Sequence, residues 1–168
     1  MCPQHDAVTI YYLEQESASE MRPKPAPPEI RVRECTTKQW MYNRFLYQWV
    51  GAGWQWTDKL SWSNAQWQAY AESDALRTWV AYVEGAPAGY YELQKHQSGA
   101  VQIMYFGLGA KFLGRGYGGY LLTHALNSAW SWQASKVEVN TCSLDHPSAL
   151  ANYRARGMTL VRTEVRDD

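Results

Sequence analysis

A glycine-rich segment, residues 105–119, carries the chain's clearest chemical pattern. It joins a stretch with strand-like alternation to one with helical periodicity, and four of the six positions 114–119 are glycine. Such glycines leave the first N–H groups of a helix uncovered, and the helix dipole adds about half a positive charge there. The segment therefore predicts a phosphate-binding turn, and Lys111 and Arg115 can add cationic contacts.

Two other interpretations fit the same glycines. They can serve only to let the helix pack tightly against the preceding strand. Gly114, Gly116 and Gly119 also satisfy the G-x-G-x-x-G pattern of dinucleotide-binding proteins. That fold needs several consecutive strand–helix units, whereas here a run of strands precedes the glycines and only about 50 residues follow them. Dinucleotide binding is therefore kept as the less favoured alternative.

Tryptophan and tyrosine form the second chemical signal. The chain has nine Trp and twelve Tyr but only three Phe, and six of the tryptophans fall between residues 40 and 67. These rings combine an apolar body with a polar handle, so they serve cores and also pockets for polar or cationic ligands. That stretch is where we first expect a pocket.

Hydrophobic periodicity predicts the elements that position these residues. Alternation predicts strands at 8–15, 30–34, 78–83, 88–94, 101–108, 136–142 and 159–165. Spacings of three and four predict helices from Thr36 or Thr37 to about 50, at 64–71 behind Ser63, at about 116–133 and at 147–156. Short turns between 78 and 108 indicate an antiparallel meander, and the strand–helix–strand from 101 to 142 indicates a parallel crossover.

Length, charge and cysteine count limit the classes of protein. The 168 residues suit one domain over residues 30–168, with an N-terminal strand and a proline-rich connector over residues 1–29 packed on it. Sixteen basic and sixteen acidic residues balance, which argues against nucleic-acid or membrane partners. Three widely spaced cysteines predict neither disulfides nor a metal site. Without a signal sequence or a long apolar run, we expect a cytoplasmic protein.

The chain resembles the GNAT superfamily of acetyl-CoA-dependent N-acetyltransferases over residues 30–168. The family motif [Gln/Arg]-x-x-Gly-x-[Gly/Ala] is matched by 113–118, with Leu113 departing from its first position. A second motif, Asn-x-x-Ala-x-x-x-Tyr-x-x-x-Gly, is matched by 146–157, with His146 in the Asn position. The two motifs fall in the family's order, and residues 141–147 look like one bacterial branch of it.

The resemblance implies an α/β fold with a mixed, mostly antiparallel sheet of about six to seven strands and about four flanking helices. Two parallel strands, here 101–108 and 136–142, would separate like a V and hold the pantetheine arm of acetyl-CoA. No metal is implied. The acetyl-CoA-binding residues implied are Phe106, Gly107, Leu108, Leu113, Gly114, Arg115, Gly116, Tyr117, Gly118, Gly119, His146 and Tyr153.

The resemblance also implies direct transfer of the acetyl group to an amine in a ternary complex. Tyr153 matches the family tyrosine that protonates the departing thiolate. Deprotonating an alkylammonium at pH 7 costs about 4 to 5 kcal/mol of free energy. We expect Glu92 as base or ammonium anchor, with Asp145 and His146 as alternatives, and we expect His124, on the polar side of its helix, to face solvent.

The acceptor pocket is expected to come from the first helix and the following loop. Trp-x-Trp-x-Asp at 54–58 offers aromatic walls and a counter-charge for an amine, although the rings can equally seal the core. The partner expected is a small-molecule or peptide amine, and a homodimer is compatible with the sequence. A non-catalytic acyl-CoA-binding or regulatory module is the alternative function. The expected acceptor residues are Tyr42, Asn43, Tyr47, Trp54, Trp56, Asp58 and Glu92.

Overall fold

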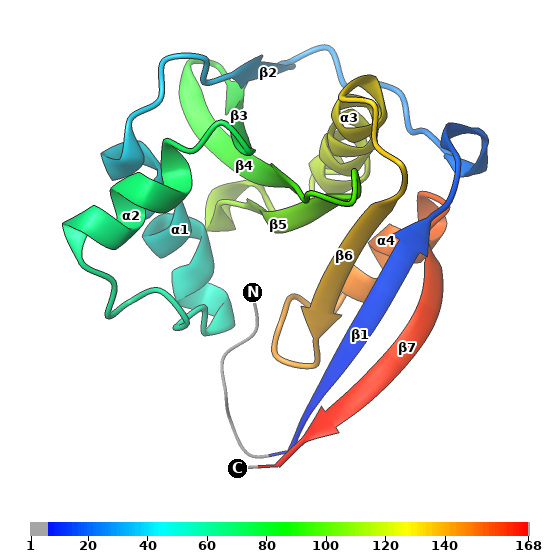
Figure 1. Cartoon of the computed structure of the whole chain (residues 1–168). Helices are drawn as coiled ribbons and strands as arrows, with labels where there is room; N and C mark the ends of the chain where they lie inside the picture. The colour runs from blue at the N-terminus through cyan, green and yellow to red at the C-terminus, as the bar shows by residue number, and fades with distance from the viewer. Residues whose placement is uncertain (1–6, 168) are drawn as a thin grey trace.

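A computed structural model of the chain describes residues 7–167 and has one mixed sheet at its centre (Figure 1). The strand order is β2-β3-β4-β5-β6-β1-β7, and four helices flank the sheet, as the α/β prediction required. The strands are β1 (Val8–Gln15), β2 (Ile30–Glu34), β3 (Leu76–Val83), β4 (Ala86–Lys95), β5 (Val101–Leu108), β6 (Val137–Cys142) and β7 (Thr159–Arg166). The helices are α1 (Trp40–Gly51), α2 (Asn64–Ala71), α3 (Tyr117–Ser131) and α4 (Ala149–Ala155).

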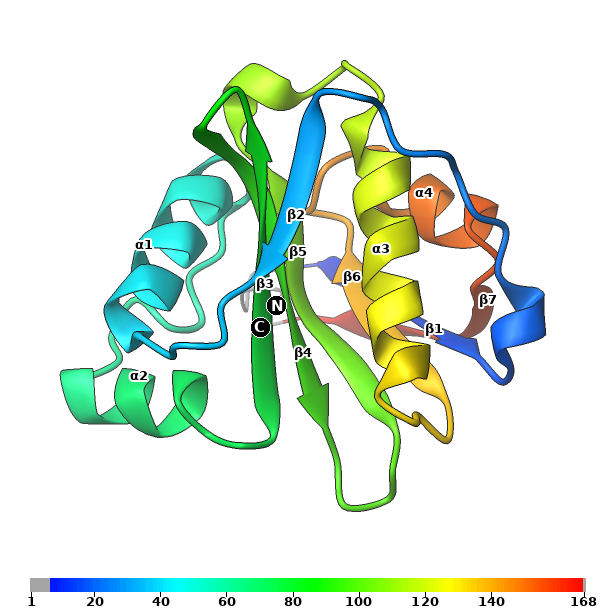
Figure 2. The same cartoon turned by 90° about the horizontal axis from the view of Figure 1, so that it is seen from above.

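The helices cover opposite faces of the sheet (Figure 2). On one face, α1 and α2 bury an aromatic-rich cluster with β3, β4 and β5, in which Leu46 and Tyr105 are almost fully buried. On the other face, α3 and α4 pack a mainly aliphatic cluster against the sheet, including Leu121 and Ile103. The central strands β3, β4 and β5 therefore place side chains in both of these cores.

The two parallel strands diverge, as the family resemblance implied. β5 and β6 pair only from Val101–Val137 to Ile103–Val139, although both strands continue well beyond these residues. The antiparallel pairing of β4 with β5 shifts register after Ile103, so Met104 is an extra residue on β5. Such a bulge turns a strand away from its neighbour. The opening between β5 and β6 therefore begins next to the bulge.

The N-terminal strand lies inside the C-terminal part of the sheet. β1 pairs antiparallel with both β6 and β7, so that Ile10 lies opposite Cys142 on one side and Glu164 on the other. The connector after β1 then runs beside α3 to reach β2 at the far edge of the sheet (Figure 2). The first 29 positions thus contribute a strand to the same sheet as the rest of the chain.

One helix boundary differs from the prediction. α1 begins at Trp40, and its cap is Gln39 rather than a threonine. The backbone N–H of Trp40 is bound by the carboxylate of Glu72 at 3.3 Å, so an acceptor from the end of α2 takes the place of a local cap. The predicted Ser63 cap of α2 is confirmed as a reciprocal capping box with Gln66.

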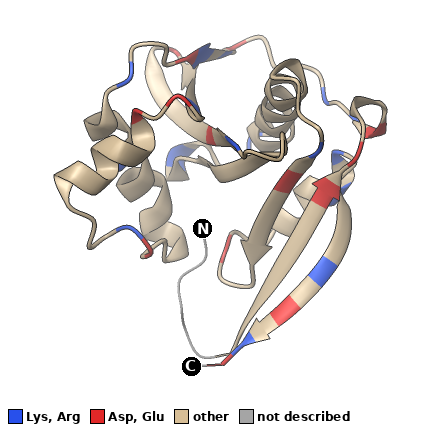
Figure 3. Cartoon of the chain, viewed as in Figure 1, with Lys and Arg blue, Asp and Glu red and all other residues tan. Residues whose placement is uncertain are grey.

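Strand β7 is one edge of the sheet and carries alternating charges. Figure 3 shows basic and acidic positions side by side along it, and Glu164 lies 3.7 Å from Arg162 and 3.3 Å from Arg166. Charges on an edge strand oppose pairing with other chains. Within residues 7–167, no helix has the length and apolarity needed to cross a membrane.

Candidate functional site

A cavity of about 580 Å³ lies where β5 and β6 diverge. The first turn of α3 forms part of its wall. This helix starts behind Gly116, which has φ +82° and gives no side-chain cap, and its first turn holds no acidic residue. The cavity therefore meets a helix start whose positive end has no side-chain counterpart. The expected residues that line it are Phe106, Gly107, Leu108, Leu113, Gly114, Gly116, Tyr117, Gly118, Gly119, His146 and Tyr153.

Three glycines of the turn, Gly114, Gly116 and Gly118, have room for a Cβ in this structure. Gly114 and Gly116 have φ of +75° and +82°, and a Cβ on either would meet nothing within 4 Å. A Cβ on Gly118 would lie 3.7 Å from Nδ2 of Asn152, an ordinary contact distance. The fold therefore needs Gly114 and Gly116 for their backbone conformation, and Gly118 leaves space within the cavity wall.

Gly107 has a packing reason of its own. A Cβ there would lie 2.6 Å from Cγ1 of Val50 on α1, which is a clash. This glycine is therefore required on the α1 side of the sheet, whatever binds on the cavity side. Arg115 lies outside the cavity: it is exposed, and its guanidinium carbon is 5.5 Å from the ring centre of Phe112.

Tyr153 of α4 places its ring in the cavity wall, 6.1 Å from that of Phe106. The side chain is only 3% exposed, and its hydroxyl forms no hydrogen bond within residues 7–167. Burial, with the nearby Asp145 carboxylate, raises the pKa of the phenol. The hydroxyl therefore stays protonated and keeps a donor available for a partner in the cavity.

His146 presents a defined tautomer to the same cavity. Its Nδ1 accepts a 2.9 Å hydrogen bond from the backbone N–H of Ser148, so the neutral ring carries its proton on Nε2. The ring also packs edge-on against Trp54, with centroids 4.9 Å apart. Because the Trp54 contact and the Ser148 bond hold the ring, Nε2 is a fixed donor.

Trp54 and Trp56, expected in the acceptor pocket, line this same cavity. The indole N–H of Trp56 donates to Asp145 at 3.3 Å, and Asp145 also accepts from the backbone N–H of Cys142 at 3.1 Å. These bonds tie the loop after α1 to the loop after β6. The aromatic loop and the phosphate turn therefore form one cavity rather than two.

The other expected acceptor residues lie in a buried network between α1 and the sheet. Asn43, which is 5% exposed, donates hydrogen bonds to Glu92 at 2.8 Å and to Thr78 at 2.9 Å. The hydroxyl of Tyr47, a residue that is 1% exposed, donates a 3.0 Å hydrogen bond to Asp58. None of these residues lines the cavity, and neither does Tyr42, whose hydroxyl is paired with that of Tyr82 at 3.0 Å.

Glu92 is fully buried in that network. Its two carboxylate oxygens accept hydrogen bonds from Tyr70 at 2.6 Å and Asn43 at 2.8 Å. Burial raises the pKa of this carboxyl above its ordinary value, and the two donors oppose part of the rise. The carboxylate of Glu92 therefore contacts the side chains of Tyr70 and Asn43 and is not exposed to solvent.

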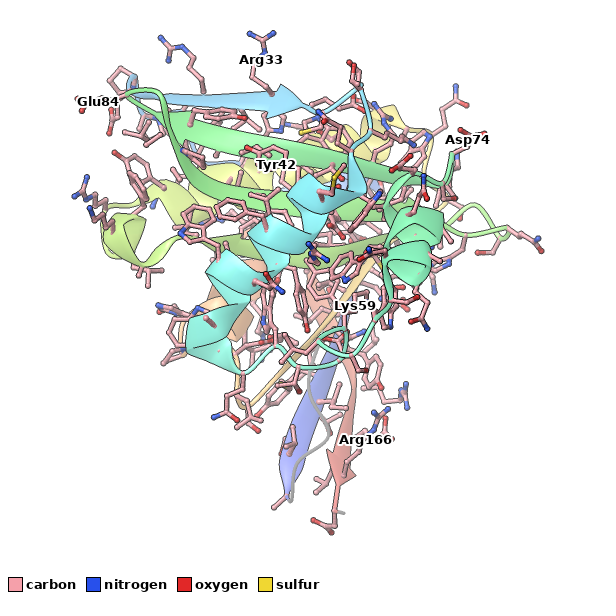
Figure 4. All side chains as sticks on the ribbon, turned by 90° about the vertical axis from the view of Figure 1, so that its left-hand side faces the viewer. Arg33, Tyr42, Lys59, Asp74, Glu84 and Arg166 are labelled. Carbon is pink, nitrogen blue, oxygen red and sulfur yellow. The ribbon has the colours of Figure 1, made fainter. Side chains whose placement is uncertain are left out.

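Lys59, which sequence reasoning missed, occupies an aromatic cage on this side of the sheet (Figure 4). The cage consists of Trp62, Tyr70 and Tyr105, whose ring centres lie 4.5, 4.9 and 4.7 Å from the ammonium. The ammonium also donates 3.2 Å to Asp58. The chain's own lysine thus makes the cation–π and ionic contacts that we expected of a bound amine.

Two further expectations are wrong. His124 does not face solvent: its Nδ1 lies 2.6 Å from the hydroxyl of Tyr91, because that tyrosine reaches from β4 to the helix. Cys142 is disulfide-bonded, whereas Cys35 is a free thiol and Cys2 lies outside the described residues. Within residues 7–167, no group of three or more His, Cys, Asp and Glu side chains can hold a metal ion.

Comparisons with known proteins agree with this fold. The acetyltransferase (GNAT) family model matches residues 37–158, so the chain belongs to this family. A GCN5-related N-acetyltransferase from Sphaerobacter thermophilus is 18% identical with a TM-score of 0.72, over 96% of this chain and 51% of that one. One from Kribbella flavida is 15% identical with a TM-score of 0.68, over 95% and 58%.

Another solved structure matches over nearly its whole length. An aminoglycoside acetyltransferase from an uncultured soil sample is 14% identical with a TM-score of 0.66, over 83% of this chain and 95% of that one. No curated protein sequence matches the chain. The chain spans only 51–60% of the first three similar structures, and at such identities the likeness shows the fold alone.

Proposed function

We propose that the protein transfers the acetyl group of acetyl-CoA to an amine of a small molecule or peptide, by direct attack in a ternary complex. The observation that carries the proposal is the cavity between the diverging strands, which joins an uncapped helix start to a buried tyrosine hydroxyl. When bound, acetyl-CoA supplies an acyl group activated as a thioester.

The residues present fit such a ligand along its length. The first turn of α3, behind Gly114 and Gly116, would hold the phosphates through backbone N–H groups. Beyond Ile103 the edge of β5 that faces β6 is no longer paired with that strand, so residues 106–108 offer backbone groups to the pantetheine amides. A backbone N–H here would also polarise the thioester carbonyl.

Tyr153 and His146 would act as the two side-chain donors. The Tyr153 hydroxyl, which is protonated and has no partner within residues 7–167, would donate to the thiolate as it departs. The Nε2–H of His146 would hold the pantetheine arm in place, since its Nδ1 is already used by Ser148. Both roles need only donors that the fold already orients.

Glu92 would be the base that finally receives the acceptor's proton, since it is a carboxylate of the buried network next to β5. Both of its oxygens are bound and it does not line the cavity, so the proton would travel from the amine through water to the Tyr70 hydroxyl, which would pass its own proton to Glu92. A water molecule in the cavity is the alternative proton acceptor. A pH–rate profile of Glu92→Gln separates them: a loss of turnover that grows toward low pH supports Glu92, and an unchanged profile supports water.

Direct attack is supported by the state of the cysteines. The sulfur of Cys142 is held in a disulfide and offers no nucleophile. Burial, with the neighbouring Glu34, raises the pKa of the Cys35 thiol and so disfavours its thiolate. A covalent acetyl-cysteine on either residue is therefore unfavourable.

The deciding experiment measures acetyl-CoA binding and then CoA thiol release. Acetyl-CoA at 100 times its dissociation constant should stabilise the fold by about 2.7 kcal/mol, whereas NAD should not. Thiol release should depend on an amine from a panel of polyamines, aminoglycosides and lysine peptides. Binding without release for every amine would favour the non-catalytic acyl-CoA-binding module, and absence of binding would overturn both functions.

A further inference from the structure

The connector between β1 and β2 is fastened against α3 and α4. At the start of the connector, the backbone N–H of Arg22 donates a 3.0 Å hydrogen bond to the carbonyl of Arg156. At its end, Glu29 accepts a 2.8 Å hydrogen bond from the hydroxyl of Tyr117, the first residue of α3. These two contacts fix the course of the residues between them past the helix start.

Lys24 lies between those two contacts and reaches the cavity. Its backbone N–H donates a 2.9 Å hydrogen bond to Oγ1 of Thr123. This hydroxyl in turn donates a 2.8 Å hydrogen bond to the carbonyl of Gly119. The side chain of Lys24 crosses the first turn of α3: Cδ is 2.6 Å and Nζ 3.5 Å from where a Cβ of Gly119 would lie. Lys24 is exposed overall and lines the cavity, so the ammonium is placed beside the helix start.

Arg156 brings a second cation to the same point. Its Nη1 lies 3.3 Å from the same Cβ position on Gly119. Its Nε is buried and has no hydrogen-bond partner in the part of the chain that the structure describes, an uncommon state for a guanidinium. Within residues 7–167, neither Arg156 nor Lys24 forms an ion pair with a carboxylate. Two cations and the positive end of a helix therefore converge there, and the nearby carboxylate, Glu29, is bound to Tyr117 and forms no ion pair with either cation among the described residues.

We infer that Lys24 and Arg156 form a clamp for a phosphate group of the nucleotide half of CoA. The inference rests on the proposed use of acetyl-CoA and adds a part of the chain to it. Phosphate oxygens would neutralise both cations and receive charge-assisted hydrogen bonds, which offsets their mutual repulsion. Lys24 lies outside residues 37–158, which match the family, so the N-terminal connector supplies a ligand contact of its own.

The test compares the affinities of three ligands for four proteins by calorimetry. The ligands are CoA, dephospho-CoA and S-acetylpantetheine, which has no nucleotide. The proteins are wild type, Lys24→Met, Arg156→Met and the control Arg33→Met, which removes one positive charge from an exposed side chain that points away from the molecule (Figure 4). Each clamp variant should weaken CoA by about tenfold, the loss expected for one charged hydrogen bond. Arg33→Met should leave it unchanged.

The pattern of losses assigns the phosphate or removes the clamp. A loss for CoA alone assigns the 3′-phosphate, and an equal loss for CoA and dephospho-CoA assigns the pyrophosphate. An equal loss for S-acetylpantetheine would overturn the clamp, as would unchanged CoA affinity in folded Lys24→Met. If wild type binds no CoA, the proposed function fails, and the clamp is then tested with inorganic pyrophosphate. Stabilisation of wild type but not of Lys24→Met by pyrophosphate still supports the clamp. Equal effects of pyrophosphate on the two proteins overturn it.

Discussion

The ammonium of Lys59 donates a 2.6 Å hydrogen bond to the hydroxyl of Tyr105 and lies 4.7 Å from the centre of the same ring. The Tyr105 hydroxyl in turn donates to Asp58, which also accepts from Lys59. Cation, phenol and carboxylate thus satisfy one another at the edge of the aromatic core. Burial together with the Asp58 charge raises the pKa of Tyr105, so the phenol remains a donor.

Replacing Lys59 with Met should therefore destabilise the fold by about 2 kcal/mol, because Asp58 and the Tyr105 hydroxyl each lose a charged hydrogen-bond donor. The Lys59 side chain is 9% exposed, so solvent replaces it poorly. Urea unfolding measures the loss. The matched control is Lys111→Met at an exposed position, which should change stability by less than about 0.5 kcal/mol. Equal effects of the two changes would contradict this account.

Tyr90 and Tyr91 are neighbours on β4 with opposite polar environments. The Tyr90 hydroxyl is buried with no partner within residues 7–167, whereas that of Tyr91 contacts His124 at 2.6 Å and Ser128 at 2.8 Å. Tyr90→Phe should raise the free energy of unfolding by up to about 1 kcal/mol, and Tyr91→Phe should lower it by about 1 kcal/mol or more. Thermal unfolding of the two variants should show shifts of opposite sign.

Glu92 should make stability fall as the pH rises. Its pKa in the folded chain lies above 4.5, so the folded state holds this proton to higher pH than the unfolded state does. Its contribution is therefore fully present below about pH 4.5 and is lost as the pH rises through the folded pKa. Unfolding free energies across this range should fall more steeply in wild type than in Glu92→Gln. The exposed control Glu84→Gln should follow wild type.

Gly118→Val should abolish tight acetyl-CoA binding in a folded protein. A Cβ at this position meets Asn152 Nδ2 at 3.7 Å and Leu108 Cδ1 at 3.9 Å, so packing accepts it while the branched side chain fills the cavity wall. We expect an affinity loss of more than about tenfold. The control Gly53→Val, where a Cβ meets nothing within 4 Å, should bind as wild type. Wild-type affinity in the Gly118 variant would remove this turn from the binding site.

Tyr153→Phe should reduce turnover by about 10²-fold and leave the KM for acetyl-CoA nearly unchanged. The hydroxyl has no partner in the described part of the fold, so its removal should not change the melting temperature. The measurement is steady-state thiol release under conditions where chemistry limits the rate. Turnover within a factor of about three of wild type would make Tyr153 structural and leave water as the proton donor.

The order of strands and helices could be predicted from sequence because their signals are local. Period-two and period-3.6 patterns hold over whole elements, and Ser63 with Gln66 forms its cap within one turn. The start of α1 could not be predicted in this way, because Glu72 binds its first N–H from a distant helix end. His124 was misjudged for a similar reason, since Tyr91 arrives from another element.

In the candidate site, too, residues of continuous motifs could be predicted and residues placed by distant contacts could not. The glycine turn and Tyr153 belong to continuous motifs, and these residues line one cavity. Trp54 and Asp58 belong to one short motif but lie in different places, because Lys59 binds Asp58 and draws it into the buried network. Lys24 had no recognisable signal, since its place beside α3 depends on the path of the whole connector.

The position of β1 between β6 and β7 has a consequence for synthesis on the ribosome. β1 is synthesised well before its partners β6 and β7: Tyr12 contacts Glu164, 152 positions along the chain. Contacts this distant in sequence form slowly. Until they form, β1 is an apolar strand with two unpaired edges, a target for chaperones and for aggregation. Nascent chains arrested before β6 should therefore remain protease-sensitive at residues 8–15, and this sensitivity should disappear only when β7 has been released.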